Sequence, residues 1–150
     1  KLPKSILPRF AMFLLLTNKD VSVCDKLKVS NKLKKFVGSC IENIDCPDTD
    51  ISFKRVISKI GGDCATDFFS VYFLYHNKHF DENRIKSILN EPCTVADLAV
   101  NGDDLKSLGI IGENIKKVLL KLLDTVYEDT AKNERESLIT LAKHLKGELK

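Results

Sequence analysis

The sequence predicts an all-α fold, a compact bundle of about seven to eight helices, and three observations support this. Apolar residues recur at helical spacing along almost the whole chain, whereas runs that alternate between apolar and polar residues are few. Capping residues, glycines and prolines separate the periodic segments. The 150 residues are 43% hydrophobic and 30% charged, which is typical of a globular chain long enough to bury a core.

The first two predicted helices lie before residue 47. One is expected from Ile6 onward, with Pro8 in its first turn, where a proline is tolerated. Ser30 or Asn31 is expected to cap the second helix, which carries apolar residues on one face. Pro47 closes that helix, because proline cannot continue the backbone hydrogen bonds.

Three further helices are expected before residue 91. Thr49 or Asp50 caps a short helix that stops at the glycine pair 61–62. The segment Ala65–Tyr75 is apolar on nearly all sides, which predicts a central, buried helix. Its β-branched and aromatic content would also suit a strand. Asp81 is expected to cap the helix that follows.

Two start signals follow residue 93. Thr94 with Asp97 forms a capping-box pattern. In such a box, the side chain of each residue accepts a hydrogen bond from the backbone N–H of the other. Asn101-Gly102 is a turn dipeptide. After it, a short helix is expected to open at one of two acidic residues, Asp103 or Asp104.

Glycines separate the short helix from the long helix that follows it, and a capping pair precedes the last predicted helix. Gly109 stops the short helix, and Gly112 precedes a strongly periodic helix that continues to Val126. Asn133 with Glu136 has the pattern of a capped final helix.

The cysteines indicate free thiols rather than disulfides or a metal centre. Their number is odd and no Cys-x-x-Cys pair occurs among the five, Cys24, Cys40, Cys46, Cys64 and Cys93. A zinc site of Cys40, Cys46, His76 and His79 can be written down, but five residues separate the two cysteines, a poor spacing for structural zinc. We predict no metal site and no cofactor in this chain.

Targeting and membrane signals are missing. The longest apolar run, 10–16, is too short to span a bilayer, and no cleavage pattern of a signal peptide follows it. These features predict a soluble, cytoplasmic protein with no membrane partner. The chain begins with Lys1 rather than Met, so a piece of a longer protein is one interpretation.

Catalytic motifs are likewise missing from the sequence. It has no Gly-rich phosphate loop, no Gly-x-Ser-x-Gly elbow and no His-Glu-x-x-His. Asp48 and Asp50 have the spacing of a metal-binding carboxylate pair, but the glycine pair 61–62 follows the intervening helix and no Arg comes after it. An acidic loop that leads to an N-cap is the favoured interpretation, so we predict no active site in this chain.

Positive charge is concentrated in the first of two expected regions, residues 1–90 and 91–150. The first holds 15 Lys+Arg against 10 Asp+Glu, and the second 9 against 11. Five lysines crowd into ten residues with only Asp25 opposing, namely Lys26, Lys28, Lys32, Lys34 and Lys35. Lys28, Lys32 and Lys35 share a helical face if the helix begins early enough. This cluster is either a solvated helix face or a contact surface for RNA phosphates.

A second candidate surface lies between residues 105 and 119. Two helices joined by Gly-Ile-Ile-Gly, 109–112, resemble a helix-hairpin-helix, in which backbone amides and nearby lysines hold a phosphate. The cations would be Lys116, Lys117 and Lys121. The alternative is a tight turn that needs glycine for positive φ, and Glu113 in the first turn of the second helix would repel a phosphate.

The order of several motifs points to a family. Residues 98–105, Leu-Ala-Val-Asn-Gly-Asp-Asp-Leu, precede a Leu-Gly-Ile, a Gly at the start of a long helix and an Asn before the last helix; the matching positions are Asn101, Gly102, Asp104, Gly109, Gly112 and Asn133. Upstream, Lys-Val-Ser-Asn-Lys at 28–32 is similar to a Leu-(Lys/Arg)-x-Ser-Asn segment. Together they resemble the C-terminal region of bacterial tRNA nucleotidyltransferases, the CCA-adding enzymes and their poly(A)-polymerase-like relatives.

The resemblance implies a parent enzyme of head, neck, body and tail, whose head uses Mg²⁺ with CTP and ATP. None of the motifs of the head or neck occurs in these residues. The chain is similar to a helical body, 1–90, and a helical tail, 91–150. Its implied task is to hold tRNA while the catalytic head and neck of the same parent protein extend the 3′ end. We expect the two lysine groups described above to contact the RNA, with the upstream group supplying much of the attraction.

Two other functions are compatible with the sequence. The chain could be a protein-interaction module that uses the apolar segments 65–75 and 115–127 as a docking or homodimer surface. It could also be a free-standing helix-hairpin-helix protein that binds the DNA backbone.

Overall fold

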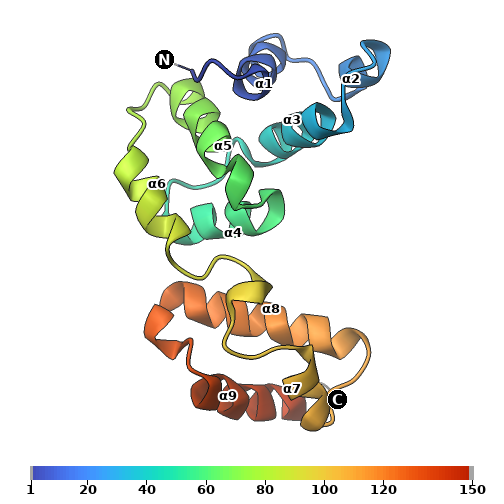
Figure 1. Cartoon of the computed structure of the whole chain (residues 1–150), viewed down its shortest axis with the longest axis vertical. Helices are drawn as coiled ribbons and strands as arrows, with labels where there is room; N and C mark the ends of the chain where they lie inside the picture. Colours follow the sequence, from blue (N-terminus) through green and yellow to red (C-terminus); the bar gives the residue numbers. More distant parts are fainter. Residues whose placement is uncertain (1, 149–150) are drawn as a thin grey trace. The chain divides into compact units, whose positions relative to one another are not determined.

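The computed structural model describes residues 2–148, and within that range the all-α prediction is confirmed. The described residues form nine α-helices, two 3₁₀ helices and no strand. In chain order these are α1 (Ile6–Leu16), α2 (Ser22–Lys26), α3 (Asn31–Asn43), α4 (Asp50–Ile60), α5 (Gly62–Tyr75), α6 (Glu82–Leu89), η1 (Val95–Asp97), α7 (Gly102–Ser107), α8 (Glu113–Glu128), η2 (Thr130–Lys132) and α9 (Arg135–Glu148) (Figure 1). None of the helices between residues 2 and 148 combines the length and apolar content that a bilayer crossing needs.

The chain divides into two compact units, which we describe separately. The first unit ends at Ile88 and the second unit begins at Leu89. In the first unit, α1 packs against α3 and α5, and α4 packs against the same two helices. In the second unit, α8 packs against α7, α9 and both 3₁₀ helices.

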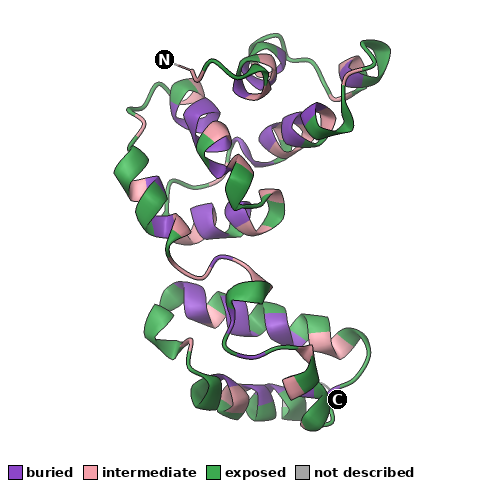
Figure 2. Ribbon diagram, in the orientation of Figure 1, coloured by how far each residue is buried: buried purple, intermediate pink, exposed green. Residues whose placement is uncertain are grey.

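Helix α5 is the centre of the first unit. Its buried residues are Ala65 and the continuous run from Phe68 to Phe73, and Figure 2 shows buried positions in purple. The segment Ala65–Tyr75 is therefore a buried helix, as predicted, and the strand alternative is wrong. The helix begins at Gly62, three residues earlier than predicted, because Gly61 alone separates it from α4.

An aromatic cluster fills the space between α4 and α5. The ring of Phe53 lies 4.5 Å from Phe69, 5.3 Å from Tyr72 and 5.9 Å from Phe73, measured between ring centroids. The guanidinium of Arg84 covers Phe53 at 4.7 Å from the ring centroid, which is a cation–π distance. Phe53 is fully buried, so it joins α4, α5 and α6 through one side chain.

Three predicted N-caps of the first unit are confirmed. The hydroxyls of Ser30 and Thr49 and the carboxylate of Asp81 accept backbone N–H bonds at the starts of α3, α4 and α6. Helix α2 was not expected, since its five residues are too few to show a helical period. The carboxylate of Asp20 accepts from the backbone N–H of Ser22 at 2.8 Å, at the start of this helix.

The start of the second unit contains two capping boxes. The predicted box of Thr94 and Asp97 is confirmed. Asn101-Gly102 is not a turn that precedes the helix; Asn101 is the N-cap of α7 and Gly102 is its first residue. Asn101 accepts from the backbone of Asp104, and the carboxylate of Asp104 accepts from the backbone N–H of Asn101 at 2.9 Å. The short side chain of Asn makes this second box possible.

Asn133 has a different role from the predicted one. It does not cap the last helix with Glu136, because α9 begins only at Arg135. Its side-chain amide donates to the carbonyl of Asp97 at 2.9 Å, and its side-chain oxygen accepts from the N–H of Ala99 at 2.9 Å. Asn133 thus ties the chain before α9 to the η1 segment.

Candidate nucleic-acid interface

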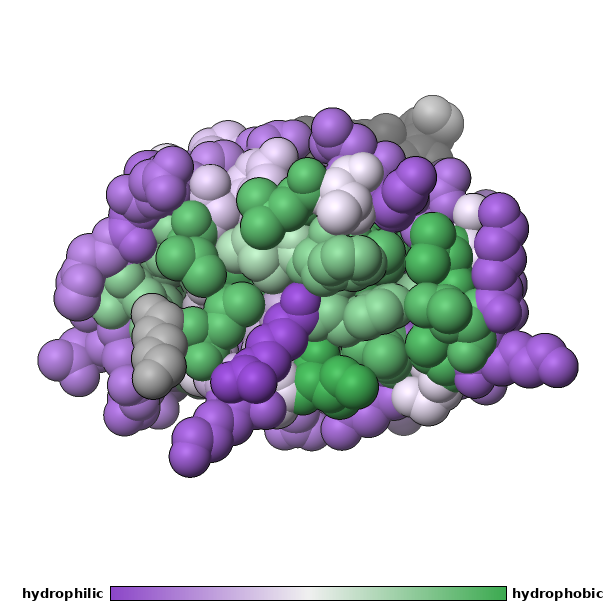
Figure 3. Space-filling view, turned by 90° about the horizontal axis from the view of Figure 1, so that it is seen from above, coloured by the Kyte–Doolittle hydropathy of each residue, from purple (hydrophilic) through white to green (hydrophobic). Residues whose placement is uncertain are grey.

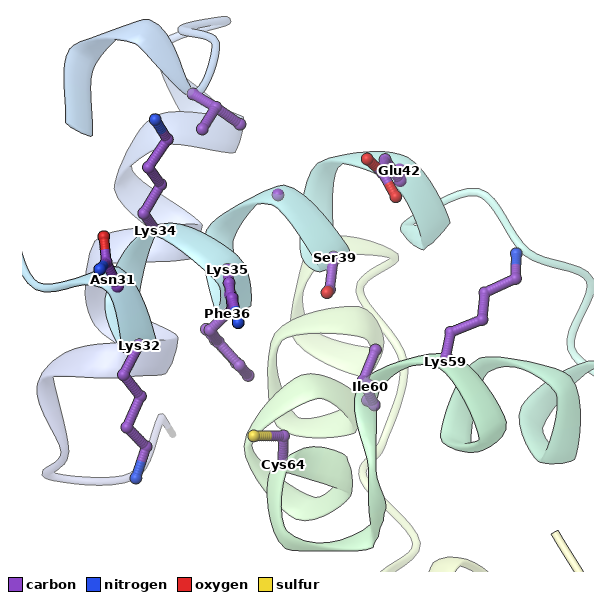
Figure 4. A pocket seen from close by; sticks show the side chains of 12 residues that line it. Asn31, Lys32, Lys34, Lys35, Phe36, Ser39, Glu42, Lys59, Ile60 and Cys64 are labelled. Atoms are coloured by element: carbon purple, nitrogen blue, oxygen red, sulfur yellow. The ribbon is translucent and has the colours of Figure 1, made fainter. Parts of the chain in front are cut away.

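A cleft lined by four lysines lies between α3 and the junction of α4 and α5. Its volume is about 1000 Å³. Its polar lining includes Asn31, Lys32, Lys34, Lys35, Ser39, Glu42, Lys59 and Cys64 (Figure 4). Glu42 is the acidic member of this set, so the lining has a net positive charge that can attract anions.

Three of these lysines have no acidic partner among residues 2–148, and two of the three, Lys32 and Lys35, are on α3. Lys34 is paired with Asp25 at 2.5 Å, and the ammonium of Lys59 donates to the side-chain oxygen of Asn43 at 3.2 Å. Within residues 2–148, Lys32 and Lys35 form no ion pair. Figure 4 shows Lys32 and Lys34 extending from α3 in opposite directions. Lys32 and Lys35 are therefore the strongest candidates for contact with a phosphate.

The structure brings together only part of the predicted upstream cluster. Lys32, Lys34 and Lys35 line the cleft, whereas Lys26 and Lys28 do not. The predicted common helical face of Lys28, Lys32 and Lys35 is wrong, because α3 begins at Asn31 and Lys28 lies before it with φ of 51°. Lys59, which the sequence analysis did not select, completes the cleft from α4.

The lysines expected in the hairpin region belong to the second unit. Lys116, Lys117 and Lys121 are exposed on α8, in the same helix whose first residue is Glu113. The preceding turn has positive φ at Gly109, 77°, and at Gly112, 62°, as a tight turn between helices requires. A side chain of α9 caps the C-terminal end of α7 in this turn, because the ammonium of Lys146 donates to the carbonyl of Leu108 at 2.7 Å.

The remaining motif residues hold the second unit together. Asn101, Gly102 and Asp104 form the start of α7, and Asp104 also pairs with Arg135 at the start of α9. Asn133 makes the two hydrogen bonds described above. These residues therefore act within the second unit, in caps, turns and an ion pair.

The carboxylates of Asp48 and Asp50 do not fit a magnesium site. Asp48 pairs with Lys78 at 2.6 Å and with Arg84 at 2.7 Å, and Arg84 also bonds Asp50 at 2.8 Å. The hydrogen bonds from Lys78 and then Arg84 hold the pKa of Asp48 below its usual value. Because both carboxylates are neutralised by cations of the chain itself, we assign them no role toward Mg²⁺ or a nucleotide.

His76, a member of the alternative zinc set, has a hydrogen-bond partner within the first unit. A nitrogen of the His76 ring lies 2.8 Å from the carbonyl oxygen of Ile44, which is a hydrogen-bond distance. Among the described residues, no group of three or more His, Cys, Asp or Glu side chains could hold a metal ion.

Cys64 offers a chemical probe of the cleft. Cys64 is half-buried and its side chain lines the cleft. Burial raises the pKa of Cys40 to about 12 and that of Cys46 to about 11, which keeps both of these thiols protonated at neutral pH. Because the thiolate is the reactive form, we expect N-ethylmaleimide at pH 7.5 to modify Cys64 before Cys40 and Cys46. Mass spectrometry of digested protein over time measures the order. Faster modification of Cys40 would contradict the placement of these side chains.

The apolar helices of the protein-interaction alternative are used inside each unit. Phe68, Phe69, Val71, Tyr72 and Phe73 of α5 are buried in the first unit, and the apolar face of α8 is buried in the second. A docking surface would have to lie elsewhere.

The site assembled in the first unit is thus a lysine-lined cleft, with cations supplied by α3 and α4. Ammonium groups in such a cleft can neutralise phosphate oxygens. No family model, curated protein or solved structure matches the chain.

Proposed function

We propose that this chain binds tRNA and holds it by its sugar–phosphate backbone in the lysine cleft. The observation that carries the proposal is that Lys32, Lys34 and Lys35 of α3 and Lys59 of α4 line one cleft. Helix α3 presents two of these ammonium groups without an acidic partner within residues 2–148. Lysines held on two packed helices present a fixed pattern of charge, which suits recognition of a folded RNA by shape.

The choice of tRNA within folded RNAs is supported by the resemblance of residues 93–145 to the tail of tRNA nucleotidyltransferases. In this proposal the chain positions tRNA for 3′-end nucleotide addition, and the chemistry belongs to a catalytic head whose motifs are not in these 150 residues. Positioning contributes to rate because it converts a bimolecular encounter into a nearly unimolecular one.

Charge reversal in the cleft is expected to weaken tRNA binding at least about tenfold. It should also reduce the magnitude of the slope of log K against log salt concentration by about three, because about three phosphate contacts are lost. The variant is Lys32→Glu combined with Lys35→Glu and Lys59→Glu, three changes of exposed side chains. Fluorescence anisotropy with labelled tRNA at several salt concentrations measures both quantities.

A control variant with the same change in net charge separates local from global effects. Lys19→Glu, Lys86→Glu and Lys143→Glu reverse three exposed lysines outside the cleft. This control should keep most of the affinity. Equal losses in the two variants, or unchanged binding in the cleft variant, would refute the proposal, and tighter binding to duplex DNA than to tRNA would favour the hairpin-type DNA binder instead.

Protection of Cys64 supplies an independent measurement. Saturating tRNA should slow its alkylation by N-ethylmaleimide, because the thiol lines the cleft. The alkylation rate of Cys46, which does not line the cleft, should not change.

A further inference from the structure

Helix α1 has an exposed apolar face on the side that does not pack against α3 and α5. Its sequence, ILPRFAMFLLL, contains Arg9 as the one charged residue. The side packed on α3 and α5 is buried through Pro8, Ala11, Met12 and Leu14. On the outer side Ile6, Phe13 and Leu16 remain 67%, 56% and 69% exposed. Three large apolar side chains on one short helix are more than the scattered exposure usual for a protein surface.

The exposed side chains form a stripe suited to a second helix. Phe13 follows Ile6 by seven residues and Leu16 follows Phe13 by three, so all three lie on one side of α1 over about 15 Å. The ring of Phe10 lies 6.4 Å from that of Phe13 and continues the apolar surface between them. This spacing is the one with which apolar side chains of one helix enter the gaps of another.

A groove continues the stripe toward α3. It has a volume of about 460 Å³ and is lined by Ile6, Leu7, Val29, Ser30, Lys32 and Leu33. Figure 3, which looks onto this end of the first unit, shows a broad apolar area bordered by hydrophilic side chains. A concave apolar groove next to an exposed helix accepts a ridge of side chains, as an amphipathic helix provides, better than a planar surface does.

The charge around this face selects the partner. Residues 1–19 contain no Asp or Glu, and Lys4, Arg9 and Lys19 are exposed on or beside α1. Lys32 adds a cation at the groove. Pairing of α1 with a second copy would bring these cations together without an acidic residue of α1 to oppose them. A partner helix with acidic residues beside its apolar stripe would instead be attracted.

We propose that the outer face of α1 and its groove form a docking site for an acidic amphipathic helix of a partner polypeptide. The site does not depend on the proposed function of the lysine cleft. The two surfaces share Lys32, so variants that test docking leave that residue unchanged.

Binding of a synthetic helix to the full chain tests the proposal. The probe is a fluorescent 20-residue peptide of Leu, Ala and Glu with leucines at i, i+3, i+4 and i+7. The first control peptide has Lys at every Glu position, and the second has the same composition in scrambled order. We expect the acidic peptide to bind at least about tenfold more tightly than either control, and its affinity to fall as salt rises.

Substitutions on α1 locate the binding. Phe13→Glu and Leu16→Glu should each reduce peptide affinity about tenfold or more, whereas Leu120→Glu, at a 44% exposed leucine of α8, should leave it unchanged. Leu16→Ser serves as a milder second variant, and circular dichroism verifies that helix content is kept. Affinity for tRNA should be the same in all these variants, which separates this test from that of the cleft.

Three results would overturn the proposal. The wild-type chain could bind the acidic peptide no better than the controls, or the α1 variants could bind it like wild type. Sedimentation could reveal a dimer that Leu16→Glu dissociates, which would make the face a self-interface. Vesicles with anionic lipid could bind the chain through α1 while the peptide does not, which would make it a membrane contact.

Discussion

Replacing Phe53 by alanine is expected to lower the free energy of unfolding of the first unit by about 3–5 kcal/mol. The ring is fully buried and lies within 6 Å of Phe69, Tyr72 and Phe73, so its removal leaves a cavity at the centre of the unit. It also removes the surface on which the guanidinium of Arg84 rests. Amide hydrogen exchange of α4 and α5 measures the loss in that unit.

Phe53→Leu is the matched control for the aromatic contribution. Leucine keeps most of the buried apolar volume but not the ring contacts, so it should cost roughly half as much as alanine or less. Equal losses in both variants would show that ring geometry, rather than burial, dominates at this site. A loss below about 1 kcal/mol for alanine would contradict the burial of Phe53 itself.

Tyr127→Ala should destabilise the second unit by about 3–5 kcal/mol. Tyr127 is a buried residue of α8, and its hydroxyl donates to the carbonyl of Cys93 at 2.7 Å, across 34 residues of sequence. Alanine therefore removes a large apolar side chain and also leaves that carbonyl without this donor. Denaturant unfolding with exchange of the α8 amides as the readout measures the effect.

Tyr127→Phe isolates the hydrogen bond from the packing. The phenyl ring fills the same space, so the expected loss falls to about 1–2 kcal/mol. If phenylalanine were as costly as alanine, the hydroxyl would be the main contribution of this residue. If it cost nothing, the bond to Cys93 would not be formed in solution.

Local signals allowed much of the fold to be predicted. A cap depends on a side chain and a backbone group a few residues apart, which is why Ser30, Thr49, Asp81 and the Thr94 box could be recognised. Predictions from local sequence were wrong where a side chain bonds a residue far away in the sequence. Asn133 has a capping residue's chemistry, but its bonds reach residues 97 and 99, and no sequence spacing indicates that pairing.

The cleft could be predicted in part for a similar reason. Lys32, Lys34 and Lys35 stand together in the sequence and were selected as a cluster. Lys59 lies on another helix, and only the packing of α4 against α3 brings it to the same cleft. Lys28 was selected because of proximity in sequence, but the backbone turns with positive φ before α3 begins. A cluster of lysines in the sequence indicates that a basic surface exists. Which residues belong to that surface depends on how the helices pack.

The single glycine between α4 and α5 fixes how the lining residues of these two helices are placed relative to one another. Helix α4 contributes Lys59 and Ile60 to the lining and α5 contributes Cys64, while the direction of one helix relative to the other depends on Gly61 with φ of 84° and ψ of 150°. That conformation is essentially restricted to glycine. An insertion or deletion here would change the direction of α5 relative to α4 and so displace Cys64 from Lys59 and Ile60. Lineages that retain the cleft are therefore expected to vary its side chains and to keep this junction at one residue.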